Sequence, residues 1–469
     1  MGKIFDVAII GGGIVGASIF SDLNRNGYKS ILIEKELDVA TGATKANSGI
    51  IHAGFDAKPN TLKAKFNAMG NKMYPELCDR LGVKLTKCGA FVLGDNPDTI
   101  KELLHRGKLN GVDGLKALNK ATLKKLIPNI SENITCGLMA ENSYIVNPYL
   151  LNICLAEEGV VNGGEVRLGF ETKLISKKNG IFHIKGNGET IFAKVVINSA
   201  GAGYNDVATL IGSETYKIEF RRGEYYVLDN SEKNLVASTM FPLPTKAGKG
   251  ILVTPTVDGN ILVGPTSYSS TSDTITSEGG LVDIKQKSSL IINNINFGKT
   301  IRVFAGIRTI VGDDFVVEQS KKISGVINIA GICSPGLSSA PAISKYVISE
   351  LLGFNYSNNP KCKKIKPYIK LSELTLEQQN KLIKKNSDYG KIICKCENVS
   401  LGEIKDAINR PIQPTTMDAI KRRVRAGMGR CQGGFCNDRV AMILANEHNI
   451  KFTDIKKERK HSYYVKGDM

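Results

Sequence analysis

With 469 residues, the chain can bury a large core and is long enough for more than one domain. Its formal net charge is +18, and the lysines behind it are spread along the whole sequence, which a compositional bias explains. The functional explanations of this charge are an anionic substrate, an acidic redox partner or loose contact with an anionic membrane. There is no nucleic-acid recognition motif and no basic stripe with interleaved aromatic residues, so we expect no nucleic-acid partner.

The first predicted elements have the order of a dinucleotide-binding unit. Residues 4–10 are an apolar run typical of a buried parallel strand, and a glycine-rich turn follows at residues 11–16. A helix is expected from Val15 to Asn26, and a second strand over Ser30–Ile33 ends at Glu34. This order predicts a Rossmann-type site, although the motif alone does not separate NAD from FAD.

Three glycines of this turn have separate physical roles. Gly11 makes the turn, Gly13 lets the backbone approach a pyrophosphate, and Gly16 allows the helix to pack closely on the strand. The helix start at Val15 supplies positive dipole to the phosphates. Glu34 would accept a hydrogen bond from a ribose hydroxyl.

A long loop of small residues follows, with the sequence Thr41-Gly-Ala-Thr-Lys-Ala-Asn47-Ser48-Gly49-Ile-Ile-His52-Ala-Gly54. It is too polar and too rich in glycine for a core helix. The loop closely resembles the flavin-contacting loop of the FAD-dependent glycerol-3-phosphate dehydrogenases and oxidases and of the related L-2-hydroxyglutarate enzymes. All of these belong to the D-amino-acid-oxidase-like superfamily, so the resemblance implies FAD as the cofactor.

The resemblance continues in order over residues 4–352. It includes a second FAD stretch at 195–202, substrate-domain strands at 222–226, 249–255 and 258–266, a substrate-anchoring turn at 305–308, and a final flavin loop at 331–342. By this resemblance, the residues expected to contact FAD are Gly11, Gly13, Val15, Gly16, Glu34, Thr41, Asn47, Ser48, Gly49, Thr172, Ala200, Gly201, Gly331, Ile332, Gly336, Leu337 and Ser338.

The same resemblance implies the domain organisation. We expect an α/β fold, with a Rossmann-type FAD-binding domain, an interleaved α+β substrate domain and a small helical domain at the C-terminus. The expected segments are an FAD domain of about 1–80, 140–215 and 300–352, a substrate domain of about 81–139 and 216–299, a polar linker with one short helix at 353–390, a cysteine module at 391–450, and a basic, mobile tail at 451–469.

Two residues are candidates for the chemistry of alcohol oxidation, in which a hydride moves to flavin N5 while a base takes the hydroxyl proton. His52 is the candidate base, because an imidazole with an ordinary pKa near ~6.5 can accept a proton at neutral pH. The alternative is that His52 only hydrogen-bonds the flavin or its own loop. Arg308 offers a planar fork that matches a phosphate or a carboxylate, and its alternative is a surface ion pair.

Other basic and hydroxyl residues are expected near the substrate. The family resemblance places Ser48, Lys249 and Ser334, together with His52 and Arg308, at positions that bind substrate or flavin. Arg221 and Arg222 could add positive potential to the same site, with one of the two serving a structural role.

Four cysteines near the C-terminus form two close pairs, Cys394-Lys-Cys396 and Cys431-Gln-Gly-Gly-Phe-Cys436. Four thiolates are the ligand set of an iron–sulfur cluster or of a structural zinc, but neither pair has the CxxC spacing usual for zinc. The pattern resembles the ferredoxin-like module of the bacterioferritin-associated ferredoxin type, which implies a 2Fe–2S cluster. Amphipathic helices are expected over Leu401–Asn409 and Thr416–Gly427.

A run of basic residues from Lys421 to Arg430 leads directly into Cys431. Such runs are usually solvated helix faces. The alternatives are that the guanidinium groups favour the reduced form of an anionic cluster, or that they dock an acidic partner.

The remaining features concern the compartment. Six further cysteines occur singly, which is typical of a reducing cytoplasm rather than of a disulfide framework. No leader sequence is apparent, and no uncharged apolar run approaches the 18 or more residues that span a bilayer. We expect a soluble, cytoplasmic protein without a membrane span, for which peripheral membrane contact remains open.

The sequence therefore predicts FAD-dependent oxidation of glycerol 3-phosphate to dihydroxyacetone phosphate, with electrons passed through a 2Fe–2S cluster to a partner protein. One alternative is an L-2-hydroxyglutarate dehydrogenase, since Arg308 also suits a carboxylate. Two others are an amine or opine oxidase subunit and a non-catalytic electron-transfer subunit. Because a linker is expected to separate the two modules, deletion of 391–469 is expected to leave the flavin bound and reducible.

Overall fold

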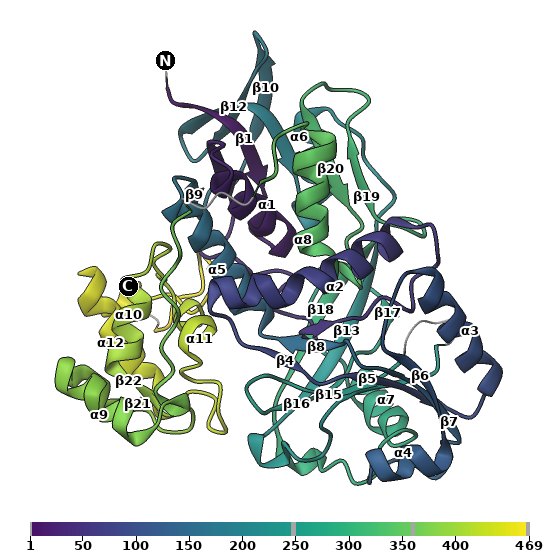
Figure 1. Ribbon diagram of the computed structural model, residues 1–469. Coiled ribbons are helices and arrows are strands. Elements are labelled where there is room, and N and C mark those ends of the chain that lie inside the picture. The colour runs from purple at the N-terminus through teal and green to yellow at the C-terminus, as the bar shows by residue number, and fades with distance from the viewer. Residues whose placement is uncertain (1, 245–249, 358–361, 466–469) are drawn as a thin grey trace.

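The computed structural model describes residues 2–244, 250–357 and 362–465, which form two large sheets and a small C-terminal module (Figure 1). In the described residues the first sheet has the order β10-β11-β12-β1-β2-β9, and β20 pairs with both β12 and β19. The bounds are β1 (Ile4–Ile10), β2 (Ser30–Ile33), β9 (Glu165–Arg167), β10 (Leu174–Lys178), β11 (Ile181–Gly186), β12 (Glu189–Asn198), β19 (Val316–Gln319) and β20 (Val326–Ala330).

The centre of this sheet is parallel, because β1 pairs in parallel with β2 and β12, and β12 with β20. All four residues of β2 are buried, as expected for a parallel strand covered on both faces. Helix α1 (Ile14–Arg25) is buried along its whole length and packs against α5 (Pro148–Val161) and α8 (Gly336–Tyr346). The predicted strand–turn–helix–strand unit is thus present, with the helix starting one residue earlier than expected.

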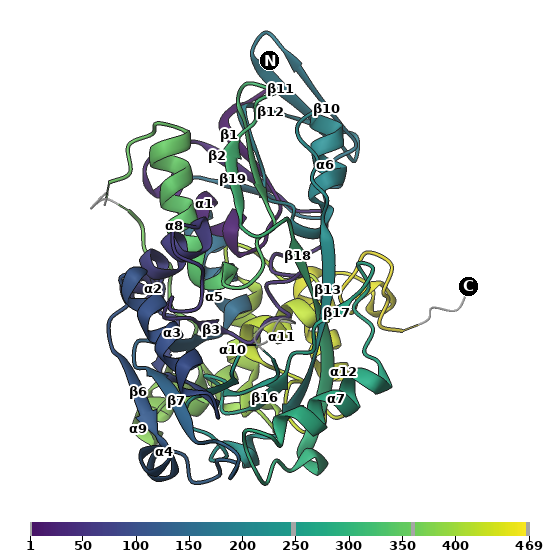
Figure 2. The same cartoon turned by 90° about the vertical axis from the view of Figure 1, so that its right-hand side faces the viewer.

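The second sheet has the order β17-β13-β16-β15-β14-β5-β7-β6 in the described residues, and β18 pairs with β13. Its strands are β5 (Ala90–Gly94), β6 (Leu115–Asn119), β7 (Cys136–Ala140), β13 (Glu219–Leu228), β14 (Thr239–Pro242), β15 (Leu252–Pro255), β16 (Ile261–Gly264), β17 (Tyr268–Ser269) and β18 (Thr300–Ile310). The long strands β13 and β18 run side by side from this sheet toward the first one (Figure 2).

One domain boundary differs from the expectation. The sequence places residues from about 300 onward in the FAD domain, but all of β18 belongs to the second sheet through its antiparallel pairing with β13. The boundary therefore lies after Ile310. The reason is that sheet membership depends on a partner strand far away in the sequence.

The remaining elements of the first 352 residues surround these sheets. A small sheet of β3 (Ile50–Ile51), β8 (Tyr144–Val146) and β4 (Leu85–Lys87) lies between them, below α2 in Figure 1. The other helices are α2 (Leu62–Leu81), α3 (Pro97–Leu109), α4 (Lys120–Leu126), α6 (Tyr204–Ile211) and α7 (Glu278–Ser288).

The C-terminal module is small and mostly helical, and lies beside α5 (Figure 1). It contains α9 (Leu376–Lys385), β21 (Ile392–Cys394), β22 (Val399–Ser400), α10 (Leu401–Ile408), α11 (Met417–Val424) and α12 (Asn437–His448). Its own core includes the fully buried Ile404, Ile420 and Leu444. Ser400 and Glu403 form a reciprocal cap at the start of α10, which fixes where that predicted helix begins.

The module is docked on the FAD domain rather than separated from it by the linker, so that expectation is wrong. The Tyr368 hydroxyl in the linker donates to Glu157 of α5 at 2.9 Å. Arg410 of the module donates through Nε to the same buried carboxylate at 2.9 Å. One charge on α5 therefore fixes both the linker and the module.

Two further expectations for the C-terminal region are also corrected. Arg422 and Arg423 are not a solvated helix face, since both are buried against Asp38 of the FAD domain. The described part of the tail, through residue 465, is not a loose extension, because it is tied to the module by main-chain bonds from Met417 and Asp418 to Lys456 and Lys457.

Candidate active site

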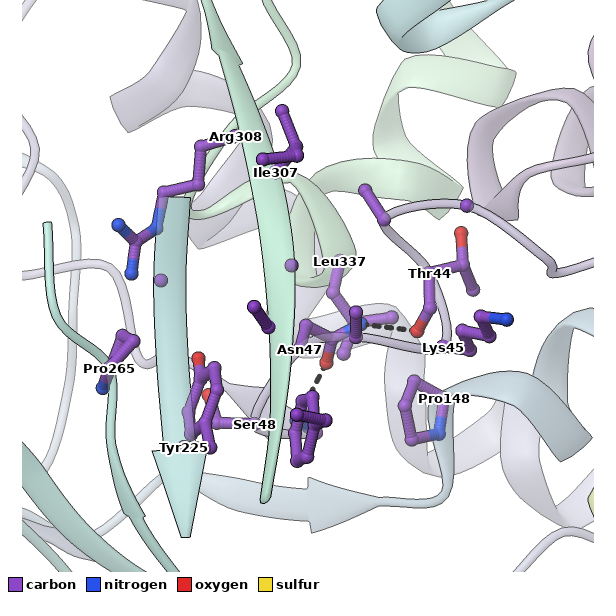
Figure 3. A pocket seen from close by; sticks show the side chains of 18 of the residues that line it. Thr44, Lys45, Asn47, Ser48, Pro148, Tyr225, Pro265, Ile307, Arg308 and Leu337 are labelled. Carbon is purple, nitrogen blue, oxygen red and sulfur yellow. Dashed lines mark hydrogen bonds between the residues drawn. The ribbon is translucent and has the colours of Figure 1, made fainter. Parts of the chain in front are cut away.

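A cavity of about 1760 Å³ is lined by residues of both large sheets, the loop 41–52 and the C-terminal module. The glycine turn opens into it at one end, and β13 and β18 form another wall. Part of this lining is shown in Figure 3. The cavity brings together most of the residues that the sequence nominates for FAD and substrate.

The glycine turn is built so that larger residues would not fit. Gly11 has φ +114°, and a Cβ there would lie 2.5 Å from the Ser199 carbonyl oxygen. A Cβ on Gly16 would lie 2.1 Å from the Gly11 carbonyl oxygen, so α1 can approach β1 only with glycine at this position. Gly13 precedes the first turn of α1 and lines the cavity. The start of a helix therefore faces open space, which fits a bound pyrophosphate.

Glu34 follows β2 at the same end of the cavity. Its carboxylate accepts hydrogen bonds from the Gly12 amide at 2.8 Å and from the Glu36 amide at 3.0 Å. Burial raises the pKa of Glu34, and these amide bonds oppose that effect. The carboxylate thus supports the turn and borders the space that a ribose would fill.

The loop 41–49 is held in place by side-chain bonds of its own. Asn47 donates to the Thr44 carbonyl at 2.6 Å and accepts from the Gly49 amide at 2.7 Å. Thr44 in turn accepts from the Ile14 amide at 3.0 Å, so the loop is joined to the first turn of α1. Thr41, Asn47, Ser48 and Gly49 all line the cavity, as expected for residues that contact FAD.

The backbone of His52 is fixed from both sides. Its amide donates to Ser338 Oγ on α8 at 2.8 Å. Its carbonyl accepts from the Nδ2 atoms of Asn67 and Asn71 on α2, at 2.8 and 3.1 Å. The imidazole lines the cavity and packs on the Phe241 ring, with 5.6 Å between ring centroids. This arrangement holds the imidazole at the cavity wall.

Arg308 on β18 extends over Gly223 of the neighbouring strand, where a Cβ would lie 2.8 Å from its Nη2 atom. Its Nη1 atom donates to the Thr266 carbonyl at 3.1 Å. Arg221 pairs with Arg308 in the register of β13 and β18, and both residues line the cavity. Among the described residues, neither guanidinium is ion-paired with a carboxylate.

The neighbouring arginine has the structural role. Arg222 lies 3.2 Å from the buried carboxylate of Glu224 and 3.1 Å from Asp273. Of the two arginines that the sequence leaves undecided, Arg221 is therefore the one that adds positive potential to the cavity.

Tyr225 is a member of the site that the sequence did not nominate. It lies beside Ser48 on the strand next to Arg308 (Figure 3), and its ring stacks on Phe304 at 4.8 Å. Burial raises the pKa of Tyr225, whereas the charge of Arg308 and hydrogen bonds with Ser48 and Arg308 act in the opposite direction. The hydroxyl stays protonated at neutral pH and can donate to an anion. Asn67 and Asn71 were also missed, although two asparagines four residues apart share one face of a helix and mark a polar contact in an apolar setting.

The other expected residues fall into three groups. Ala200, Gly201, Gly331, Ile332, Ser334, Gly336 and Leu337 line the cavity, as do Gly11, Gly13, Val15 and Glu34. Gly16, Thr172 and Ser338 are not part of the lining: Gly16 permits close packing, Thr172 has a buried hydroxyl without a described partner, and Ser338 holds the His52 backbone. Lys249 lies outside the described residues.

The four cysteines of the module come together in pairs that cross the two motifs. Cys396 Sγ lies 3.6 Å from Cys431 Sγ, and a hydrogen bond from Cys436 lowers the pKa of Cys394. Gly429 packs on the first motif so tightly that a Cβ would lie 2.4 Å from the Cβ of Cys396. Within the described residues, no three potential ligands are arranged around one metal ion. Two thiolate pairs are the ligand arrangement of a two-iron cluster.

A Rossmann-type turn that opens on a large cavity, a basic substrate wall and a docked four-cysteine module define a flavin-dependent oxidoreductase with its own iron–sulfur domain. Residues 6–350 match the family of FAD dependent oxidoreductases, and residues 392–446 match the BFD-like [2Fe-2S] binding domain. The chain belongs to this FAD-dependent oxidoreductase family. The predicted fold class and both predicted cofactors, FAD and a 2Fe–2S cluster, are confirmed.

Among its relatives, the chain is 44% identical to a glycerol 3-phosphate dehydrogenase of Caloramator mitchellensis, over 99% of this chain and 98% of that protein. It is 30% identical to a glycerol 3-phosphate oxidase of Mycoplasma pneumoniae, over 76% of this chain and 96% of that protein. The solved structure of the dithionite-reduced, FAD-bound L-alpha-glycerophosphate oxidase from Mycoplasma pneumoniae covers 78% of this chain and is itself fully covered, with a TM-score of 0.74 and 29% identity. In the part of the chain that the structure describes, no helix has the length and apolar composition needed to cross a bilayer.

Proposed function

We propose that the chain oxidises glycerol 3-phosphate to dihydroxyacetone phosphate and passes the electrons through its 2Fe–2S cluster to a separate acceptor. The observation that carries this proposal is the pair Arg221 and Arg308, which face one cavity from adjacent strands together with His52. Two guanidinium groups without a carboxylate suit a dianionic phosphate. The relatives that share most of the chain have names that point to the same substrate.

The residues of the site divide the work of binding and proton transfer. Arg308 and Arg221 bind the phosphate, and Tyr225 and Ser48 offer hydroxyl groups beside them. His52 takes the proton of the substrate hydroxyl on a ring nitrogen. FAD, when bound, supplies the acceptor for the hydride that leaves the carbon atom bearing this hydroxyl. Asn67, Asn71 and Ser338 keep the His52 backbone in position.

The chain also provides a short connection between the two cofactor sites. The segment 425–432 lines the FAD cavity through Arg425, Met428 and Gln432, and it carries the cluster ligand Cys431 immediately before Gln432. The Tyr149 hydroxyl contacts Met428 Sδ at 3.5 Å from the opposite wall. The cluster ligands and the FAD cavity therefore share one wall, which supports electron transfer within the chain.

An exposed face around the cluster is suited to an acceptor protein. Cys396 is exposed, Phe435 is 85% exposed, and Met442 is 56% exposed. The basic residues Lys395 and Arg439 are exposed on the same module, and the exposed Arg430 is ion-paired with Asp229. An apolar contact on a module with exposed basic residues favours an acidic acceptor. The buried Arg422 and Arg423 take no part in this face.

Substrate assays test the proposed reaction. Purified protein loaded with FAD and iron would be assayed with an artificial electron acceptor against glycerol 3-phosphate, L-2-hydroxyglutarate and glycine derivatives. We expect turnover with glycerol 3-phosphate. Faster turnover with L-2-hydroxyglutarate would replace the proposed substrate, and no turnover with any of them would support a non-catalytic electron-transfer role.

A charge-reversal experiment tests the acceptor face. Electron transfer from the reduced enzyme to an acidic ferredoxin or flavodoxin should weaken with rising salt and with Arg439→Glu. Lys451→Glu, an equal charge change at an exposed position at the start of the tail, is the matched control. Equal effects of both variants would exclude a specific site. The ten cysteines all lie in the described residues and none of them forms a disulfide, which supports a reducing compartment, and we propose the cytoplasm.

A further inference from the structure

The C-terminal module contributes directly to the wall of the FAD cavity. Its lining residues are Asp418, Lys421, Arg422, Arg425, Met428 and Gln432, and the tail adds Glu458 and Arg459. A domain whose only role was to carry a cluster would not need to border the cavity with this many polar side chains. The contacts behind this wall show what they hold in place.

The loop 38–45 is held between the phosphate-binding turn and the module. On one side, the Ala40 amide donates to the Gly12 carbonyl at 3.1 Å, and Thr44 accepts from the Ile14 amide at 3.0 Å. The glycine turn and the first turn of α1 are the parts of a Rossmann site that contact the pyrophosphate. The position of this loop and the shape of the phosphate site are therefore linked.

On the other side, the loop is bound by charges of the module. The Asp38 carboxylate is buried and accepts from Arg422 Nη2 at 2.8 Å. It also accepts from Arg423 through Nη1 at 2.9 Å and Nη2 at 3.0 Å. Arg423 is fully buried and also donates hydrogen bonds to the Ala419 and Ile412 carbonyls, so it is fixed within the module.

The tail closes the same arrangement from outside. Glu458 accepts from Arg422 Nη1 at 2.9 Å and is ion-paired with Lys45 of the loop. Its side chain is only 20% exposed. Because the tail is tied to the start of α11 by main-chain bonds, Glu458 joins three segments: the flavin loop, the module and the tail.

We propose that the module and its tail form part of the FAD-binding site, by holding the loop 38–45 against the phosphate-binding turn. FAD binds with less loss of conformational entropy when this loop is already ordered. By thermodynamic reciprocity, bound FAD stabilises the docked position of the module and tail. Deletion of 391–469 therefore weakens FAD binding, contrary to the expectation from the sequence. The proposal is independent of the substrate's identity.

The affinity for FAD tests the proposal in the full-length chain. The apoprotein would be titrated with FAD and followed by flavin fluorescence. Glu458→Gln removes the charge that joins Lys45 and Arg422, and we expect the Kd for FAD to rise about 5-fold or more, the lower range of typical coupling between sites. The matched control is Glu447→Gln, which removes an ion pair with Lys405 on the same module away from the cavity and should leave the Kd within about 2-fold.

Limited proteolysis provides a second measurement that does not depend on catalysis. Trypsin can cut the tail at the exposed residues Lys457, Arg459 and Lys460. We expect FAD to slow this cleavage several-fold in the native sequence and in the Glu447→Gln variant, but much less in Glu458→Gln. Equal cleavage rates with and without FAD, or an unchanged Kd in Glu458→Gln, would overturn the proposal. So would an equal rise in Kd in both variants, because that would reflect general loss of stability.

Discussion

Asp38→Asn should destabilise the docked module strongly while changing the shape of the side chain very little. The native carboxylate is 1% exposed and accepts hydrogen bonds from both Arg422 and Arg423. The amide leaves two buried guanidinium groups without this counter-charge. Removing one partner of a buried ion pair typically costs about 3–5 kcal/mol. Since Arg422 keeps its bond to Glu458, we expect a value near the lower end, about 3 kcal/mol.

Urea unfolding of the FAD-loaded protein measures this effect, with the flavin and cluster absorbance as separate probes. Asp38→Asn should lower the unfolding free energy of the transition that releases the module. The double variant Asp38→Leu with Arg423→Met removes both charges of that pair. Its loss of unfolding free energy should be smaller than the sum of the losses in the two single variants, by about 1 kcal/mol or more. An Asp38→Asn protein within about 0.5 kcal/mol of the native one would refute the reasoning, since that is the usual effect of a surface substitution.

The pH dependence of this difference has a defined sign. Burial raises the pKa of Asp38, but the charges and hydrogen bonds of Arg423 and Arg422 outweigh it, so that the pKa lies below its ordinary value. A carboxylate with a lowered pKa stabilises the fold above its unfolded pKa of about 3.9, and this stability is lost as the pH falls through the folded value. The difference between native and Asp38→Asn proteins should therefore be constant from pH 8 to about 5 and shrink only below about pH 4.

Four further substitutions test the site itself. Arg308→Ala should weaken substrate binding by about 2–5 kcal/mol through loss of a charge-assisted fork, measured from the substrate dependence of flavin bleaching in stopped flow. His52→Ala should slow the bleaching rate at saturating substrate by about 10²–10⁴-fold, with a smaller effect on binding. Tyr225→Phe should raise the substrate Kd about 2- to 10-fold, the effect of one lost hydrogen bond, in the same titration. Cys431→Ser should remove the iron and the cluster signal, measured by iron analysis and electron paramagnetic resonance.

Each of these expectations can fail in a specific way. Small and equal effects of Arg308→Ala and His52→Ala would favour a non-catalytic electron-transfer subunit. Full iron content in Cys431→Ser would exclude that thiolate as a ligand. Arg222→Ala serves as the control for Arg308→Ala, because it removes a guanidinium from the same strand pair outside the substrate wall and should affect stability more than the substrate Kd.

The parts of the fold that the sequence predicts are those fixed by contiguous residues. The turn around Gly11 and Gly16 is specified by steric limits within the first β–α unit, and the two cysteine motifs by the spacing of their ligands. The candidates His52 and Arg308 are nominated by motifs that each lie on a single loop or strand, and both line the cavity. Such local constraints are visible in the sequence before any tertiary contact is known.

The parts that the sequence does not predict depend on distant partners. The charged run at Arg422 and Arg423 has the pattern of a solvated helix, and its contact with Asp38 in the opposite domain makes it an interface. Tyr225 is part of an ordinary strand pattern, and its role comes from the neighbouring Arg308 and Ser48. The choice between Arg221 and Arg222 likewise depends on where Glu224 and Asp273 lie in the fold.

The separation of Asp38 from Arg423 along the chain also bears on how the protein is made. The two residues are 385 positions apart, and their buried ion pair cannot form until Arg423 has been synthesised. At typical rates of synthesis this takes about 20–80 s after Asp38 leaves the ribosome. In the same way, β1 cannot pair with β12 until β12 has been synthesised, and β12 cannot pair with β20 until β20 has been. The nascent FAD domain thus has an unfinished sheet and an uncovered acidic loop through most of translation. Chains that stop before the module have an incomplete flavin site, and we expect chaperones and proteases to act on them.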